Sequence, residues 1–419
     1  MKKLLLLLIC LSALSCETKP STLHTGFWRA TLDVQDTKQL PFIFEVKDNG
    51  TLVIQNAEER ITVDEIEIND NEIRIQMPVF EGYFQGVFSD DGNQITGDFI
   101  KPSLDRVVPF QMIYGDRVRF PADRVGGREP ASPAGRSGKT PTTNITGNWE
   151  TVFSENGPED TYIAKGIFKQ EGRQVTGTFR TTTGDYRFLE GIMDGDQLQL
   201  SAFDGAHAFL FTATATDSTL EGQFYSGNHW KEPFRAKRNE NYQLPEATSL
   251  TYIKEGYNGL AFTFTDAEGT MVSLDDERYK NKVVLVQILG SWCPNCLEES
   301  KFYAEYVKQN PNPDFEIIGL AFEYAPTQEK AFASIQRLQD RLRISYPILL
   351  AQYGSDDKKL AQEKLPMLNH IISYPTSIFI DKKGEVRRIH TGFNGAATGQ
   401  EFVDFKTDFD QFVKSLLDE

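Results

Sequence analysis

The sequence contains little cysteine, little histidine and less basic than acidic charge, and each shortage argues against a class of protein. Only 4 of the 419 residues are cysteine and 5 are histidine. The histidines show no spacing typical of metal ligands, so we expect no bound metal and no other cofactor. Acidic residues outnumber basic residues by 60 to 44, which gives a net charge of −16. Because nucleic-acid binding depends on clustered lysine and arginine, we also expect no nucleic-acid partner.

The apolar run near the N-terminus is too short to span a bilayer as a permanent helix. It extends from Leu4 to Leu11, after the basic start Met1-Lys2-Lys3. A basic start, a short apolar stretch and small residues after it are typical of an export signal, which we assign to residues 1–15. Ala13-Leu14-Ser15-Cys16 resembles a bacterial lipobox, in which Cys16 becomes the lipidated first residue of the mature protein. A cleaved signal peptide without lipidation is the alternative.

Lipidation of Cys16 would attach the protein to a lipid bilayer through a short tether, residues 16–25. The expected location is then the cell envelope, periplasmic or on the outer face of the membrane. Cys10 leaves with the signal, so Cys293 and Cys296 are the only thiols expected to remain for chemistry. Disulfides form and persist outside the cytoplasm. Since no further cysteines are left to cross-link the fold, this pair is free for exchange chemistry.

Two segments resemble each other and predict two antiparallel β domains. Gly26-Phe27-Trp28 opens the first, over residues 26–118, and Gly147-Asn148-Trp149 opens the second, over residues 146–240. Both alternate apolar and polar residues over short runs broken by glycine and asparagine turns, as antiparallel meanders do. Residues 119–145 between them are rich in Pro, Gly, Ser and Thr and predict a linker. We expect each domain to be a barrel or a sandwich, acting as a spacer or docking module or as a ligand-binding barrel.

The pattern changes in residues 250–419, where strands alternate with helices. The continuous apolar run Val283 to Leu289 predicts a strand buried on both faces. Leu297 to Lys308 has helical composition, Phe315 to Phe322 is a second buried strand, and a hairpin and a final helix follow. This order predicts an α/β domain with a mixed sheet. The expected fold class is therefore two antiparallel all-β domains followed by one α/β domain.

The motif Cys293-Pro294-Asn295-Cys296 lies between a predicted buried strand and a predicted helix. Unpaired N–H groups and the helix dipole at a helix start favour negative charge, so we expect Cys293 to be the exposed, nucleophilic thiolate. Cys296, one turn further and buried, would resolve the mixed disulfide. A zinc site needs four ligands, and a structural disulfide across so short a loop would stabilise little. The motif therefore predicts thiol–disulfide exchange.

Residues 255–419 resemble the TlpA/ResA-like branch of the thioredoxin superfamily. The resemblance rests on Val283-Val284-Leu285-Val286, on Trp292 to Cys296 with the following acid Glu299, and on Tyr374-Pro375-Thr376 before a strand. It implies a thioredoxin-like fold in which Pro375 is a cis-proline beside the reactive cysteines. The backbone before that proline would pair with the substrate chain.

Two departures from the family pattern suggest a divergent subgroup. Lys301 replaces a proline that usually follows the second cysteine, and Asn281-Lys282 replaces a Gly-Lys pair. The resemblance also implies a buried acid at Glu323, which would accept the proton of Cys296. A solvated glutamate at a strand end is the alternative. The predicted catalytic residues are Cys293, Cys296, Pro375 and Glu323, and the predicted substrate-docking residues are Trp292, Pro294 and Tyr374.

The resemblance implies a disulfide reductase on the outer face of a membrane. A membrane thiol donor would supply its electrons, and exported protein disulfides, apocytochromes among them, would be its substrates. Pro294-Asn295 does not by itself fix the direction of transfer, because CxxC proteins span ~−270 to −120 mV.

Three other functions compete with this one. A peroxiredoxin fits poorly, because Gly290-Ser291-Trp292 supplies neither the threonine nor the prolines that its reactive cysteine needs. Copper delivery would use His370 as a ligand but needs one more residue between the cysteines. The third is a lipid-anchored binding protein, in which the β domains hold a ligand and the C-terminal domain assists.

Overall fold

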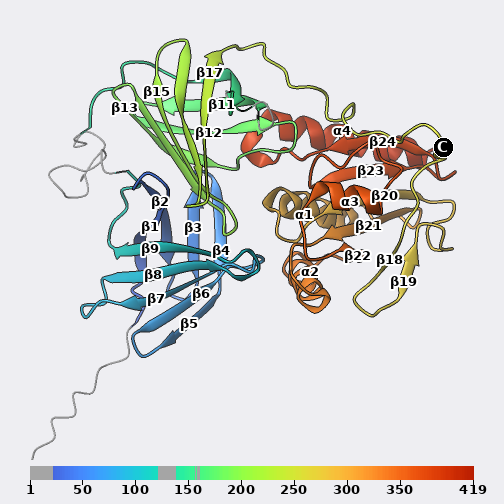
Figure 1. Ribbon diagram of the computed structural model, residues 1–419, viewed down its shortest axis with the longest axis horizontal. Helices are drawn as coiled ribbons and strands as arrows, with labels where there is room; N and C mark the ends of the chain where they lie inside the picture. The colour runs from blue at the N-terminus through green and yellow to red at the C-terminus, as the bar shows by residue number, and fades with distance from the viewer. Residues whose placement is uncertain (1–21, 121–137, 156, 158–160) are drawn as a thin grey trace, which may run out of the picture.

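The computed structural model describes residues 22–120, 138–155, 157 and 161–419 as two β units followed by an α/β unit (Figure 1). The predicted export signal, Cys10 and Cys16 lie outside these residues, as does the segment 121–137 of the predicted linker. The predicted fold class is confirmed, because both β units are antiparallel and the C-terminal unit is thioredoxin-like.

The first unit is a nine-stranded sheet in the order β4-β3-β2-β1-β9-β8-β7-β6-β5. Its edge strands β4 and β5 are separated in the chain by Asp64 alone, so the sheet is nearly closed. Gly50 has φ +82 in the turn between β2 and β3, a conformation that glycine adopts without strain. The strands are β1 (Gly26–Asp33), β2 (Gln39–Val46), β3 (Leu52–Asn56), β4 (Glu59–Val63), β5 (Glu65–Asn69), β6 (Glu72–Gln76), β7 (Tyr83–Phe88), β8 (Gln94–Lys101) and β9 (Arg106–Tyr114).

The second unit is a closed barrel, because its last strand pairs with its first. Its aromatic core faces inward, as the alternating pattern predicts. Trp149 in the barrel and Trp28 in the first sheet each donate their indole N–H to the carbonyl four residues earlier, at 2.9 Å. The strands are β10 (Gly147–Phe153), β11 (Tyr162–Glu171), β12 (Gln174–Thr181), β13 (Leu189–Asp194), β14 (Gln197–Phe203), β15 (Ala208–Ala215), β16 (Thr219–Ser226) and β17 (Trp230–Arg238).

The C-terminal unit has a mixed sheet in the order β19-β18-β22-β21-β20-β23-β24. Strands β20, β21 and β22 are parallel, and every residue of the central strand β20 is buried. The strands are β18 (Thr263–Thr265), β19 (Met271–Ser273), β20 (Val283–Leu289), β21 (Phe315–Phe322), β22 (Ile348–Gln352), β23 (Thr376–Ile380) and β24 (Val386–Thr391).

Four α-helices accompany this sheet: α1 (Pro294–Gln309), α2 (Gln328–Leu342), α3 (Lys358–Lys364) and α4 (Gln400–Leu417). Helices α1 and α4 pack on each other, with the rings of Tyr303 and Phe409 stacked at 5.4 Å between centroids. Helix α1 begins three residues earlier than its composition predicts, because Cys293 caps it and Pro294 takes its first position. Among the residues that the structure describes, no helix has both the length and the apolar character needed to cross a bilayer.

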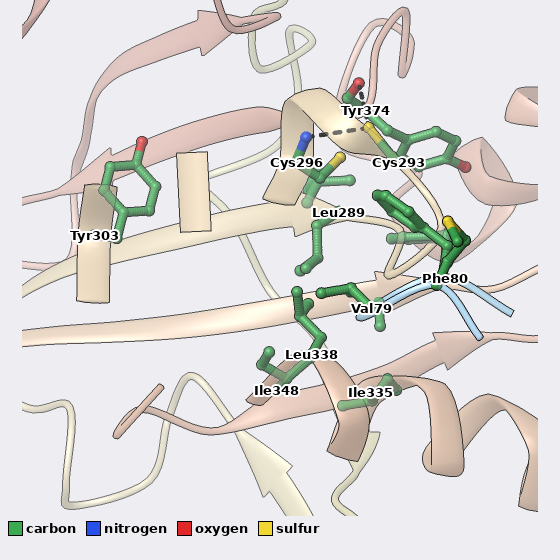
Figure 2. Close-up of a cluster of buried hydrophobic side chains, with 14 of the residues drawn as sticks. Val79, Phe80, Leu289, Cys293, Cys296, Tyr303, Ile335, Leu338, Ile348 and Tyr374 are labelled. Atoms are coloured by element: carbon green, nitrogen blue, oxygen red, sulfur yellow. Dashed lines mark hydrogen bonds between the residues drawn. The ribbon is translucent and has the colours of Figure 1, made fainter. Parts of the chain in front are cut away.

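The first sheet packs directly against the C-terminal unit. Val79 and Phe80, in the loop between β6 and β7, are buried in a hydrophobic cluster with Leu289, Leu338 and Tyr374 (Figure 2). The same contact is bordered by ion pairs from helix α2 to the start of β5, Arg337 to Glu65 at 2.7 Å and Arg341 to Asp64 at 2.8 Å. The reactive end of the C-terminal sheet therefore lies at a junction of units rather than on a free surface.

Candidate active site

Cys293 and Cys296 lie where the buried strand β20 passes into helix α1. Both are free thiols. Cys296 is fully buried, as predicted, but the prediction of an exposed Cys293 was wrong: it is only 7% exposed, because the loop at Tyr374 lies against its sulfur. The Cys296 N–H donates to Cys293 Sγ at 3.2 Å, so the first sulfur caps the helix (Figure 2). The Cys293 thiol in turn donates to the carbonyl of Tyr374 at 3.4 Å. This geometry directs the helix N-terminus at the first sulfur, where a negative charge is favoured.

Of the predicted docking residues, Tyr374 contacts the first sulfur, Trp292 contacts Tyr374, and Pro294 is the first residue of helix α1. The Trp292 indole N–H donates to the carbonyl of Phe322 at 2.9 Å, and its ring meets that of Tyr374 edge to face at 5.6 Å. The Tyr374–Pro375 peptide bond is cis. The structure therefore brings Cys293, Trp292, Tyr374 and Pro375 together, although they come from loops about 80 residues apart in the chain.

Cys296 is held in its neutral form. Burial raises the pKa of its thiol well above the ordinary value, and its contact with Cys293 raises it further. The nearby carboxylate of Glu299 also opposes ionisation of the Cys296 thiol. An acceptor for the Cys296 proton is therefore needed before this thiol can react.

Glu323, the predicted buried acid, is indeed buried, at 1% exposed. Its carboxylate accepts hydrogen bonds from the Ser291 N–H and hydroxyl, both at 2.7 Å, and burial raises its pKa to about 7. These contacts fix the loop that leads from β20 into the motif. The carboxylate that raises the pKa of the Cys296 thiol belongs to Glu299.

Glu299 is the acid to which the sequence gave no role. It is fully buried one turn beyond Cys296 and accepts hydrogen bonds from Gln287 at 2.8 Å, Tyr303 at 3.0 Å and Ser377 at 3.1 Å. Burial raises its pKa to about 7. Its spacing of three residues from Cys296 on a predicted helix, which places both on one face, is the sequence signal that could have identified it.

The barrel touches the motif directly. The Asn295 side-chain amide donates to the Asp185 carbonyl at 3.3 Å, and the Ser373 hydroxyl donates to the Thr183 carbonyl at 2.8 Å. Glu298, two residues after Cys296, forms an ion pair with Arg187. The loop between β12 and β13 thus rests on both parts of the site, the motif and the cis-proline loop.

Within the described residues, no group of three or more His, Cys, Asp or Glu side chains is placed to hold a metal ion. His370 is exposed and lies beside the amide of Asn369.

Comparison with known proteins finds a matching family model and relatives for the C-terminal unit. A family model described as Redoxin matches residues 251–404. Thiol-disulfide oxidoreductase ResA of Halalkalibacterium halodurans is 29% identical over 160 residues, which are 36% of this chain and 76% of the relative. Thioredoxin-like protein YneN of Bacillus subtilis is 27% identical over 140 residues, 33% of this chain and 73% of the relative.

A solved structure, a thiol:disulfide interchange protein of the thioredoxin family from Chlorobium tepidum, covers 40% of this chain and 99% of its own. It has 20% sequence identity and a TM-score of 0.29. These similarities concern only the C-terminal third of the chain or slightly more.

Proposed function

We propose that this chain reduces protein disulfides through Cys293 and Cys296, because residues 251–404 are a TlpA/ResA-like segment of the thioredoxin superfamily with thiol–disulfide oxidoreductase activity. The observation that carries the proposal is the unequal environment of the two thiols. Cys293 caps helix α1, whereas Cys296 is buried beside an acid.

The reaction takes place in two exchanges. The Cys293 thiolate attacks one sulfur of the substrate disulfide, so a mixed disulfide forms and the other substrate sulfur leaves as a thiolate, which takes up a proton. Cys296 then loses its proton and attacks Cys293 Sγ. The mixed disulfide breaks, the second substrate thiol is released, and a Cys293–Cys296 disulfide remains. Two electrons have passed to the substrate, and a thiol donor at the membrane returns the enzyme to its dithiol form.

Glu299 accepts the proton of Cys296 in this scheme. Its pKa of about 7 suits a group that must take a proton at neutral pH and release it later. Glu323 holds Ser291 and so positions the loop before Cys293. Pro375 and Tyr374 form the wall beside Cys293, where the substrate backbone would lie, and Trp292 shields the sulfur on its other side.

The reducing direction is inferred from the family resemblance, because the CxxC motif does not by itself fix a reduction potential. We also propose that Cys16 anchors the protein to the membrane and that its substrates are exported proteins, apocytochromes among them. These follow from the lipobox-like start and from the resemblance.

Trapping tests the assignment of the two cysteines. In Cys296→Ala the mixed disulfide cannot be resolved, so a disulfide peptide should remain attached to Cys293, as peptide mapping by mass spectrometry would show. Cys293→Ala is the matched control and should trap nothing. Attachment to Cys296 in the control would reverse the assigned roles.

A further inference from the structure

The barrel contains a cavity of about 560 Å³ that opens beside the active-site motif. Its volume falls within the ~300–1,000 Å³ of small-ligand sites. Tyr186, Phe209 and Phe224 form its aromatic wall, with ring centroids 5.1 to 5.3 Å apart. Trp230, 43% exposed, lines its rim. The proposed reductase chemistry makes no use of this cavity.

Two buried acidic residues, Asp185 and Glu232, also line the cavity. Glu232 is 4% exposed, and its carboxylate accepts hydrogen bonds from the hydroxyls of Tyr162, at 2.7 Å, and Ser154. The lining residues that the structure describes include no lysine and no arginine. Burial lowers the pKa of His229 to about 4, and the nearby charge of Arg106 contributes to this shift. This lining histidine is therefore uncharged at neutral pH. A buried carboxylate is costly unless it is paired.

The cavity reaches the dithiol motif at Asn295. Asn295, which lies between the two cysteines, is one of its lining residues. A second cavity, of about 240 Å³, is lined by Trp292 next to Cys293. The two cavities share the lining residues His207, Ser226 and His229, so they adjoin each other. Lys101 and Arg106 line the second cavity only. A chain bound at Cys293 can therefore extend a side chain toward the barrel.

We propose that the barrel cavity binds a basic side chain, lysine or arginine, of the polypeptide whose disulfide is reduced at Cys293. The alkyl stem would pack against Phe209 and Phe224, the cation would face the aromatic rings, and Glu232 would supply the counter-charge. An anionic side chain would meet Glu232 without a compensating cation. This inference rests on the proposed reductase function for the identity of the ligand, but the cavity itself does not depend on it.

The test uses the full chain and two synthetic peptides, each with one internal disulfide, that carry either lysine or glutamine beside each cysteine. The wild type should reduce the lysine peptide with a kcat/KM about 10-fold higher than that for the glutamine peptide. Glu232→Gln keeps the shape of the side chain and one of its two acceptor oxygens, and it should abolish this preference. Glu221→Gln, on the same barrel but 67% exposed, is the matched control and should keep the preference. Equal rates for both peptides in the wild type, or an unchanged preference in Glu232→Gln, would overturn the proposal.

A binding measurement separates this inference from the reductase function. The lysine peptide with serine in place of its cysteines should bind the full chain in calorimetry, and less tightly to Trp230→Leu, a rim change that leaves the barrel core intact. Absence of binding overturns the inference even if a small aromatic disulfide is reduced normally. Binding without any disulfide reduction would instead overturn the proposed function alone. Cadaverine that bound as tightly as the peptide would assign the site to free organic cations and overturn the link to polypeptides.

Discussion

Burial raises the pKa of both Glu299 and Glu323 to about 7, yet the two carboxyl groups have different neighbours. Glu323 is bound by Ser291 before the motif, whereas Glu299 acts electrostatically on Cys296. The sequence identified Glu323 from its place at a strand end and left Glu299 without a role. A buried acid is recognised by its environment, which depends on residues such as Gln287 and Ser377 that are distant in the chain.

We predict that Glu299→Gln slows the resolution of the mixed disulfide by about 10²-fold, as expected for the loss of a general base. In the wild type the carboxylate form must be present, so the rate should fall as the pH drops through about 7. That inflection should be absent in Glu299→Gln. Stopped-flow measurement of the release of the second thiol, from pH 5 to 9, provides the profile.

Glu323→Gln is the control, since it removes an equally buried acid. Its pH profile should keep the inflection near 7. If instead Glu323→Gln removed the inflection and Glu299→Gln kept it, the two assignments would be exchanged.

Local pattern predicted some elements of the molecule better than others. The alternation in β6 and the apolar run of β20 are set by burial on fixed faces, so the sequence shows them directly. The local pattern predicted neither the short strand β22 nor the polar helix α3. Strand β22 forms by pairing with β21, and helix α3 forms by packing on β22. The loop between β6 and β7 is another such case: its burial depends on another unit.

We predict that Phe80→Ala lowers the free energy of unfolding by about 3–5 kcal/mol, the usual cost of removing a buried phenylalanine. Phe80 is 5% exposed and lies in the cluster with Leu289 and Tyr374. Val87→Ala, on the neighbouring strand but 43% exposed, should change stability by no more than about 0.5 kcal/mol. Urea denaturation measures both. An equally small loss of unfolding free energy in both variants would show that this loop does not pack on the C-terminal unit in solution.

Arg187 joins all three units. It is buried and forms ion pairs with Glu59 of the first sheet, at 2.5 Å, and with Glu298 of helix α1. Asp204 lies 4.0 Å away within the barrel. Burial lowers the pKa of Arg187, but the surrounding carboxylates outweigh this effect and raise it well above its ordinary value. No local pattern could predict this cluster, because Glu59, Arg187 and Glu298 are brought together only by the packing of separately folded segments.

We predict that Arg187→Met destabilises the protein by about 3–5 kcal/mol, because it leaves buried carboxylates without their partner. Arg235→Met is the control. Arg235 is 57% exposed and pairs with Glu155 at 3.2 Å, so its loss should cost about 0–1 kcal/mol. Equal effects in a urea titration would mean that the three units do not share this junction.

The most direct test of the whole account is the reduction of insulin disulfides by the purified full chain supplied with a dithiol reductant, followed as turbidity. We expect reduction well above the rate of the reductant alone, and a fall to that background rate in Cys293→Ala. Reduction that persists in Cys293→Ala, or a wild type no faster than the background, would contradict it.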